Sequence, residues 1–498
     1  MAKYKKIEDR QWQWSAINYS EFFEEDHYLN QLLNMVRKLD LSKFDENYRN
    51  DTEKGGCSAL PVDRMLSLII YSILYGNISM RALARDMSKR ADLLFLSGGI
   101  TIDHSSFCRF RNRHSEVIKD IFQQTVFLGV ESGYIDLDKV CIDGSKIKAY
   151  ANSKDMGDMK KFEKRYEKIK EICNKRYIEW EEVEDGAEKE KRLKKLSEAN
   201  CKKEKLENAL GFLESNKDKK RIHLNEPDAL LQRDKGKMII GYNAQIAVDE
   251  QKQMIIYENV ISENTDHQQT VPIVREILKL QKNLDLNDKK TKFIFDSGYA
   301  GEENLEELED ADLYLPDNEF AGLRNKELKT EIESSETLEF KYNRKQNNFL
   351  CPANNTLEYK RDTKTKNTEY AYYSAKGCKG CSLAAKCLSK SAKSKYFKVR
   401  KSYLKNIKIK KVYPPGKGPK IHYGPLTLAM REKLRTEMGK NIFSIRGYIV
   451  EGVFGCIKVA RNGSRFFRIG INKVRNEWTE RCIAHNIAKL LDFRLHET

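Results

Sequence analysis

The length, composition and charge of the chain exclude several classes of protein. Its 498 residues exceed the ~100–200 of a typical domain, and 40% are apolar, more than a disordered chain would carry. No stretch approaches the ~20 apolar residues that a membrane span needs, and the polar start MAKYKKIEDRQW lacks the apolar run of a secretory signal. We therefore expect a cytoplasmic protein with more than one structural unit and no membrane segment.

The charge of the chain favours polyanionic partners. Lys and Arg outnumber Asp and Glu 91 to 74, which gives a formal charge of +17. Neutralising phosphates releases counterions, so a basic excess of this kind favours binding to nucleic acid. The excess is uneven, because residues 370–431 contain no acidic residue while Lys and Arg recur through them. This segment is predicted to face nucleic acid.

Residues 60–132 are predicted to be helical, since apolar residues recur at helical spacing from Leu66 onwards and Asp103 can cap a later helix. Short helices, a tight turn and basic side chains are typical of a helix-turn-helix-like unit, although a helical bundle with a charged face would give the same pattern. We predict an α-helical DNA-binding domain over residues 1–135. Its expected DNA contacts are Arg81, Arg85, Arg109 and Arg111.

A strand follows, KVCIDGSKIKAY, with Asp143 between apolar neighbours. Lys and Glu then dominate residues 156–218, where Asp185-Gly186 can separate two helices. We predict a helical hairpin inserted within residues 151–236. A solvated spacer and a partner-binding arm explain this composition equally well.

Further strands are predicted at MIIGYNAQIAVDEQ and MIIYENVISEN, a helix at HQQTVPIVREILKLQKN, and a strand at KTKFIFDSGYA that ends at Asp296. With the short LYLP segment and a last helix around RGYIVEGVFGCIKVARN, this order predicts a mixed α/β core over residues 136–492. The order resembles the ribonuclease H arrangement, so we expect a ribonuclease H-like core. A second insertion, residues 317–440, would be basic and carry a group of cysteines.

Three carboxylates are candidates for metal-dependent phosphodiester chemistry, which uses hard divalent cations held by carboxylate oxygens. Asp143 interrupts an apolar strand, Asp296 ends another, and Glu451 lies on a helix with a buried apolar stripe. Each Asp alone is a weak signal, and the helix of Glu451 is a stronger one. An Asp at a strand end is more often a cap or turn former, and Glu451 with Lys458 could belong to an ordinary charged face.

In these segments the chain resembles bacterial insertion-sequence transposases of the DDE type, specifically those with a Y-x2-R-x(3–4)-E-x6-K signature on the last catalytic helix. Phe443 stands in the Tyr position and is followed by Arg446, Glu451 and Lys458. The segments CIDGSKIKAYAN, GYNAQIAVD and FDSGYAGEENL, and the N-terminal LPVDRMLSLIIYSILYGNISMRALARDM, resemble the family in consistent order between about residues 55 and 492. Phe443 is a departure, because it lacks the hydroxyl that a Tyr would offer to DNA.

The resemblance implies a DNA transposase that cuts and joins phosphodiesters without a covalent enzyme intermediate. Asp143, Asp296 and Glu451 would be the catalytic residues and the ligands of Mg²⁺ or Mn²⁺, while Arg446 and Lys458 would contact DNA. The implied partners are double-stranded DNA, as terminal repeats and as target, and a second copy of the chain in a synaptic homodimer. Association with the nucleoid follows from DNA binding.

Four cysteines form a possible cluster: Cys351, Cys378, Cys381 and Cys387. The C-x2-C pair is a common half-site for structural Zn²⁺, but the other two are irregularly spaced. Structural Zn²⁺ and unliganded thiols both remain open from the sequence.

Two other functions compete with an active transposase. A catalytically inactive, sequence-specific DNA-binding protein derived from a transposase would keep the fold, but the three intact carboxylates argue against decay. A ribonuclease H-like nuclease without strand transfer would not need the helical N-terminal region and the basic insertion.

Overall fold

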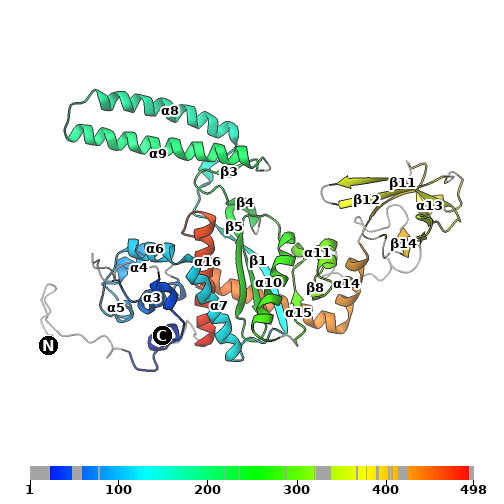
Figure 1. Cartoon of the computed structure of the whole chain (residues 1–498), viewed down its shortest axis with the longest axis horizontal. Coiled ribbons are helices and arrows are strands. Elements are labelled where there is room, and N and C mark those ends of the chain that lie inside the picture. The colour runs from blue at the N-terminus through cyan, green and yellow to red at the C-terminus, as the bar shows by residue number, and fades with distance from the viewer. Residues whose placement is uncertain are drawn as a thin grey trace, which may run out of the picture. The chain divides into compact units, whose positions relative to one another are not determined.

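A computed structural model describes residues 23–492, apart from 47–58, 77–78, 218, 235, 287–288, 319, 321–337, 366–367, 377, 379, 389–391, 402–403, 405–407 and 413–423. The chain forms two compact units. The first consists of Met1–Asp266, Pro272–Phe293 and Ser444–Thr498, and the second of His267–Val271 and Ile294–Phe443. Figure 1 shows the elements of both.

The first unit opens with a group of helices. They are α1 (Tyr28–Arg37), α2 (Ser42–Asp45), α3 (Val62–Leu74), α4 (Met80–Asp86), α5 (Ala91–Ser97), α6 (His104–Arg113) and α7 (Ser115–Glu131). Side chains at three N-caps fix where helices begin: His27 accepts a hydrogen bond from the backbone of Leu29, Ser79 from that of Ala82, and Asp103 from that of Ser106. The helical prediction for this region, with Asp103 as a cap, is confirmed.

A sheet forms the centre of the first unit. Its strands are β1 (Lys139–Lys148), β4 (Leu230–Asp234), β5 (Lys237–Asp249), β6 (Ile255–Ile261) and β7 (Lys292–Ile294). They adjoin in the order β4-β5-β1-β7, and β6 also pairs with β5. Strands β1 and β5 are antiparallel, with Asp143 opposite Ile246 and Gly144 opposite Gln245. Because side chains alternate along a strand, Asp143 and Ser145 share one face of the sheet, and Gly144 lies on the other.

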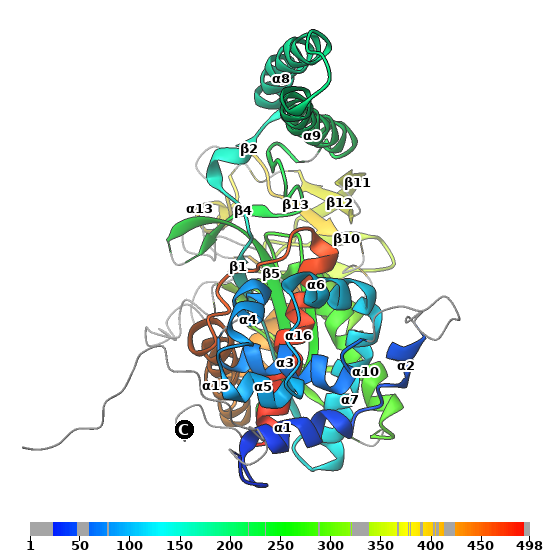
Figure 2. The same cartoon turned by 90° about the vertical axis from the view of Figure 1, so that its left-hand side faces the viewer.

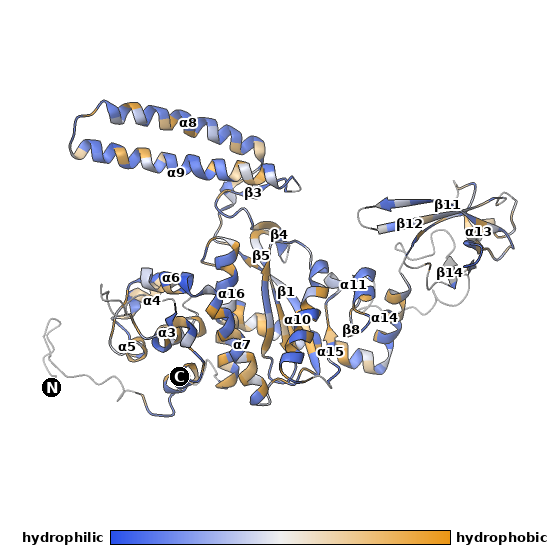
Figure 3. Ribbon diagram, viewed as in Figure 1, coloured by the Kyte–Doolittle hydropathy of each residue, from blue (hydrophilic) through white to orange (hydrophobic). Residues whose placement is uncertain are grey.

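A two-helix arm lies between β1 and β5 in the sequence. After the short 3₁₀ turn η2 (Ser153–Asp155) and strand β2 (Met156–Gly157), helix α8 (Met159–Glu181) is followed by α9 (Ala187–Ser215) and β3 (Ile222–His223). The helices separate at Asp185-Gly186, where Gly186 has a positive φ of 145°. Phe162 packs with Leu206, Ala209, Leu213 and Ile222 at one end of the arm. Most of its surface is hydrophilic (Figure 3).

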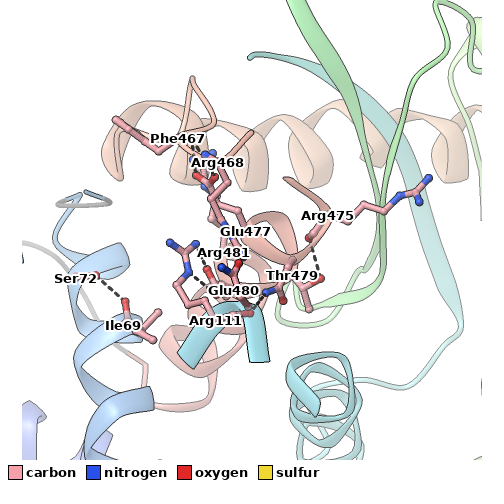
Figure 4. A network of polar contacts seen from close by, with 12 residues as sticks. Ile69, Ser72, Arg111, Phe467, Arg468, Arg475, Glu477, Thr479, Glu480 and Arg481 are labelled. Carbon is pink, nitrogen blue, oxygen red and sulfur yellow. Dashed lines mark hydrogen bonds and ion pairs between the residues drawn. The ribbon is translucent and has the colours of Figure 1, made fainter. Parts of the chain in front are cut away.

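Three further helical segments lie wholly or mostly in the first unit: α10 (Thr270–Asn283), α15 (Glu437–Gly455) with the following π-helical turn η7 (Cys456–Ala460), and α16 (Ile471–Leu490). The first residues of α10 and of α15 belong to the second unit. Helix α16 contacts α3, α7 and β6, so it joins the N-terminal helices to the sheet. Figure 2 shows α16 alongside α3. Polar side chains of α16 are therefore buried. Arg481 pairs with Glu477, and the backbone amides of Phe467 and Arg468 donate to Glu477 (Figure 4).

The second unit contains a separate antiparallel sheet. Its strands are β9 (Leu338–Asn343), β10 (Asn348–Leu350), β11 (Thr356–Thr365), β12 (Thr368–Ala375), β13 (Tyr396–Arg400) and β14 (Ile409–Val412), in the order β13-β12-β11-β10-β9-β14. One face packs an apolar core that includes Phe340, Phe349, Leu357, Tyr373 and Phe397.

The second unit also contains shorter elements, which come before, between and after the strands of this sheet in the sequence. They are η3 (His267–Gln269), η4 (Ser297–Tyr299), α11 (Glu302–Glu307), β8 (Asp312–Tyr314), α13 (Ala384–Cys387) and α14 (Pro425–Arg435). Glu302 holds the start of α14, because its carboxylate accepts hydrogen bonds from the backbone amides of Leu426 and Thr427. Arg431 of the same helix forms a two-bond ion pair with Asp317. In the part of the chain described, no helix is long and apolar enough to span a membrane.

Candidate active site

Asp143 lies in the middle of β1 and is half-buried, with its side chain 20% exposed. Its Oδ1 accepts a hydrogen bond from the Gly144 amide at 2.8 Å, and its Oδ2 lies 3.3 Å from Nη1 of Arg446. Gly144 is required here because a Cβ would lie 2.3 Å from Nε2 of Gln245 and 2.7 Å from Oδ1 of Asp266. The side chains of Gln245 and Asp266 therefore pack closely against the backbone of β1 next to Asp143, on the face opposite to the Asp143 side chain.

Arg446 and Glu451 both lie on α15. Its apolar residues Val450 and Val453 are buried, whereas Glu451 is exposed. The Glu451 carboxylate extends back towards Gly447, since a Cβ on that glycine would lie 3.7 Å from Oε1. The Arg446–Asp143 pair therefore attaches the helix that carries Glu451 to the strand that carries Asp143.

Lys458 makes a second connection between these elements. From η7, its ammonium donates hydrogen bonds of 3.0 Å to Oγ of Ser145 and to the backbone carbonyl of Lys146. Ser145 shares a face of β1 with Asp143. Ser145 was not among the residues predicted from the sequence, although its position two residues after Asp143 in a strand indicates that the two side chains share a face.

Asp296 follows β7 and occupies the N-cap position of η4, with no side-chain capping bond. The alternative role considered from the sequence, a side chain that simply caps the next turn, is therefore not observed. Asp296 belongs to the second unit, while Asp143 and Glu451 belong to the first. Within the first unit, the structure brings Arg446 and Lys458 onto β1 beside Asp143.

A divalent metal ion matches the three carboxylates by donor chemistry, because Mg²⁺ and Mn²⁺ prefer oxygen ligands. The cation now beside Asp143 is the Arg446 guanidinium. Among the described residues no group of three or more His, Cys, Asp or Glu side chains is placed to hold a metal ion.

The four cysteines of the second insertion do come together. Cys351, Cys378, Cys381 and Cys387 line one cavity beneath the β9–β14 sheet and are not joined by disulfides. Backbone amides of Asn355 and Lys395 donate to the sulfurs of Cys351 and Cys378. Within the described residues these thiols are not arranged as metal ligands, so the expectation of structural Zn²⁺ is not supported.

The arginines predicted to contact DNA differ in exposure. Arg81, Arg85 and Arg109 are exposed; Arg85 pairs with Asp86, and Arg109 donates to Ser106. Arg111 requires a correction, because its side chain is only 5% exposed and forms a two-bond ion pair with Glu480 of α16 (Figure 4).

The sequence contained a signal for the burial of Arg111. Phe107 and Phe110 of α6 are buried, and Arg111 completes their i, i+3, i+4 spacing, which places it on the apolar face of the helix. Arg111 therefore joins α6 to α16 and is not available as a DNA contact.

The polar residues of β5 were also missed. Asn243 and Gln245 are buried, and their side-chain amides each donate a hydrogen bond of 2.6 Å to the Asp266 carboxylate. Both lie on the face of the sheet that carries Gly144. These bonds satisfy polar groups that would otherwise be costly to bury.

A mixed α/β fold with an aspartate on a central strand, and a glutamate and two cations on the helical segment beside it, defines a candidate phosphodiester-processing enzyme with an architecture consistent with a ribonuclease H-like core. The family model of the transposase DDE domain matches residues 137–487, and that of a transposase domain called DUF772 matches residues 17–113. Because the first match covers well over half of the chain, the chain belongs to the DDE transposases of insertion sequences. Neither a curated protein nor a solved structure matches.

Membership of this family has two direct consequences. Transposases act on DNA, in agreement with the positive charge of the chain. DDE transposases generally use divalent metal ions such as Mg²⁺ or Mn²⁺, in agreement with a site built from carboxylates.

Proposed function

We propose that this protein is an active DNA transposase that binds the terminal inverted repeats of its element, cleaves their phosphodiesters and joins the freed ends to target DNA. The observation that carries this proposal is the Arg446–Asp143 ion pair. It fixes the helix of Glu451 against the strand of Asp143. The pair places Glu451, which lies on the same helix as Arg446, on an element attached to the strand of Asp143.

Asp143, Asp296 and Glu451 are the proposed catalytic residues. Divalent ions bound by them would offset the charge that develops on the attacking and leaving oxygens. In cleavage, a water oxygen forms a bond to phosphorus and loses a proton, and the bond to the 3′ oxygen breaks to leave a 3′ hydroxyl. In strand transfer, that hydroxyl attacks a target phosphodiester and a target 3′ oxygen leaves. The number of phosphodiester bonds is unchanged in the second step.

Arg446 and Lys458 would hold the DNA backbone and the two elements together. Arg446 can exchange its carboxylate partner for a phosphate oxygen, because a guanidinium binds both in a similar geometry. Lys458 keeps the end of β1 attached to η7 through Ser145 and Lys146. We assign Arg446, Glu451 and Lys458, with Phe443 in the Tyr position, to the Y-R-E-K signature of the last catalytic helix.

Recognition of the element ends would come from the helical N-terminal region, through the exposed Arg81, Arg85 and Arg109. We also propose that two copies of the chain act together, because two ends must be held at once for transposition.

The deciding experiment is cleavage of a labelled duplex that carries the terminal repeats, with Mg²⁺ or Mn²⁺, by the wild type and Glu451→Gln. We expect metal-dependent nicking at the ends by the wild type and none by the variant, with DNA binding retained. Glu437→Gln is the matched control, because Glu437 is an exposed glutamate on the same helix.

Other outcomes discriminate between the functions. Equal cutting by wild type and Glu451→Gln would mean that the catalytic helix is wrongly assigned. Specific binding without cutting by the wild type would favour the alternative, a catalytically inactive DNA-binding protein derived from a transposase.

A further inference from the structure

The β9–β14 sheet of the second unit has two different faces. The inner face holds the apolar core that includes Ala371, Tyr373, Phe397 and Val399. Neighbouring residues in the strands must point the other way, because side chains alternate along a strand. The outer face of β11, β12 and β13 therefore carries Arg361, Tyr370, Tyr372, Tyr396 and Lys398, which we call the tyrosine face.

Aromatic and cationic side chains alternate across the tyrosine face. Arg361 on β11 lies 5.5 Å from the ring centroid of Tyr372 on β12, and Lys398 on β13 lies 5.9 Å from the same ring. The Lys398 ammonium is also 4.1 Å from the ring centroid of Tyr370. The rings and cations thus form one continuous ladder across three strands.

The tyrosine face is open to solvent. Tyr396 is 66% exposed, and Arg361 and Lys398 are exposed as well, whereas Tyr370 and Tyr372 are half-buried. Arg400, at the end of the same face, is 14% exposed and pairs with Glu303 and Glu306, so it is not part of the open surface. Solvent exposure alone does not explain the tyrosines, because shorter polar side chains would suit a solvated face without leaving aromatic area in water.

The positive charge of the tyrosine face favours binding of a polyanion. Tyr370, Tyr372, Tyr396 and Lys398 belong to residues 370–431, which contain no Asp or Glu. The acidic residue on the outer side of β11 is Glu358, and Lys360 neutralises it at 3.0 Å. A polyanion that also offers flat aromatic groups would use both the cations and the rings.

We propose that the tyrosine face binds unpaired nucleotides of DNA, with bases stacked on Tyr370, Tyr372 and Tyr396 and phosphates held by Arg361 and Lys398. Exposed aromatics with interspersed cations on a sheet provide this kind of platform, since every base has a stacking surface whereas bases inside a duplex are already stacked. The inference rests on the proposed function for the identity of the ligand as DNA. It adds a site for single strands that are exposed when an element end is opened.

The test compares the full-length chain and its variants in binding a labelled oligothymidylate and a duplex of the same length, in EDTA so that no cutting occurs. We expect the double variant Tyr370→Ala/Tyr372→Ala to bind the single strand about tenfold more weakly, and the duplex within about twofold of wild type. The Tyr370→Phe/Tyr372→Phe variant should bind both as the wild type does, because stacking does not need the hydroxyls. Tyr177→Ala, at an exposed tyrosine of α8, is the matched control.

Photocrosslinking gives a second measurement that does not depend on the folding of variants. A single strand with 5-iodouracil should crosslink to the wild type at Tyr370, Tyr372 or Tyr396, as read by mass spectrometry. Crosslinks confined to other residues would overturn the inference. So would equal losses for single strand and duplex in the alanine variant, unchanged single-strand binding, or equal competition by polyglutamate.

The two proposals fail in different ways. If the wild type cuts element ends but its tyrosine face does not discriminate strands, only the present inference is wrong. If the wild type stacks single strands at this face but cuts no ends, the proposed transposase activity is wrong and the site stands.

Discussion

The guanidinium of Arg446 lies 3.3 Å from the carboxylate of Asp143, which joins residues about 300 positions apart in the sequence. Both side chains are largely shielded from water, with exposed fractions of 14% and 20%. An ion pair in such surroundings is costly to break on one side, because the remaining charge is left without a partner. The pair therefore holds strand β1 and helix α15 in a fixed relation at the candidate active site.

Replacing Asp143 by Asn should separate catalysis from DNA binding. Loss of a metal-ligating carboxylate removes several kcal/mol of transition-state stabilisation, so we expect cleavage to fall at least about 100-fold. DNA affinity should stay equal or increase, because Arg446 loses its competing carboxylate. End cleavage and duplex binding by Asp143→Asn measure the two effects. Undiminished cutting would remove Asp143 from the catalytic set.

Replacing Arg111 should affect stability and not DNA recognition. Arg111→Ala leaves Glu480 as a buried charge without its ion-pair partner, which should cost about 3–5 kcal/mol and lower Tm markedly. The double variant Arg111→Met/Glu480→Leu should recover most of that loss. The exposed Arg109 is the control: Arg109→Ala should leave Tm unchanged and weaken binding to the repeats. A normal Tm for Arg111→Ala would contradict the structural role.

Lys458 should contribute to the stability of the end of β1. Lys458→Met removes the hydrogen bonds to Ser145 and Lys146. We therefore expect the free energy of unfolding to fall by about 1–3 kcal/mol. Ser145→Ala should cost less, because the bond to the Lys146 carbonyl remains. Thermal unfolding of both variants tests this order. A larger effect of Ser145→Ala would mean that Lys458 acts mainly through another contact.

The half-buried Glu258 makes stability depend on pH. Burial raises the pKa of Glu258 to about 7. The hydrogen bond that Thr479 donates to the Glu258 carboxylate lowers this pKa and so offsets part of the effect of burial. The folded state thus binds the proton more tightly than the unfolded state. The contribution of Glu258 to the free energy of unfolding is therefore fully present below about pH 4.5 and is lost as the pH rises through 7.

Glu258→Gln should remove this pH dependence. The free energy of unfolding of the variant minus that of the wild type should increase by on the order of 3 kcal/mol when the pH is raised from 4 to 8. Tm values at pH 5 and pH 8 for both proteins provide the measurement. A parallel fall in Tm for the two proteins would show that other groups cause the dependence.

The sequence by itself determined the local elements and the identity of the family. The strand around Asp143, the two helices of the arm and the helix of Glu451 follow from patterns within about 20 residues, because periodicity, capping and turn residues act over that range. The three candidate carboxylates were predicted in the same way, from their positions at a strand centre, a strand end and a helix. The family follows from the order of these segments.

Only the tertiary structure decided how these elements meet. Arg111 resembled its exposed neighbours in composition, but the burial of α16 against α6 and the sheet gave it Glu480 as a partner. The ion pair of Arg446 and the ladder of Arg361, Tyr372 and Lys398 likewise depend on contacts between separate strands and helices. The physical reason is that burial and pairing energies arise between segments far apart in the chain, while sequence patterns report only which side of its own element a residue occupies.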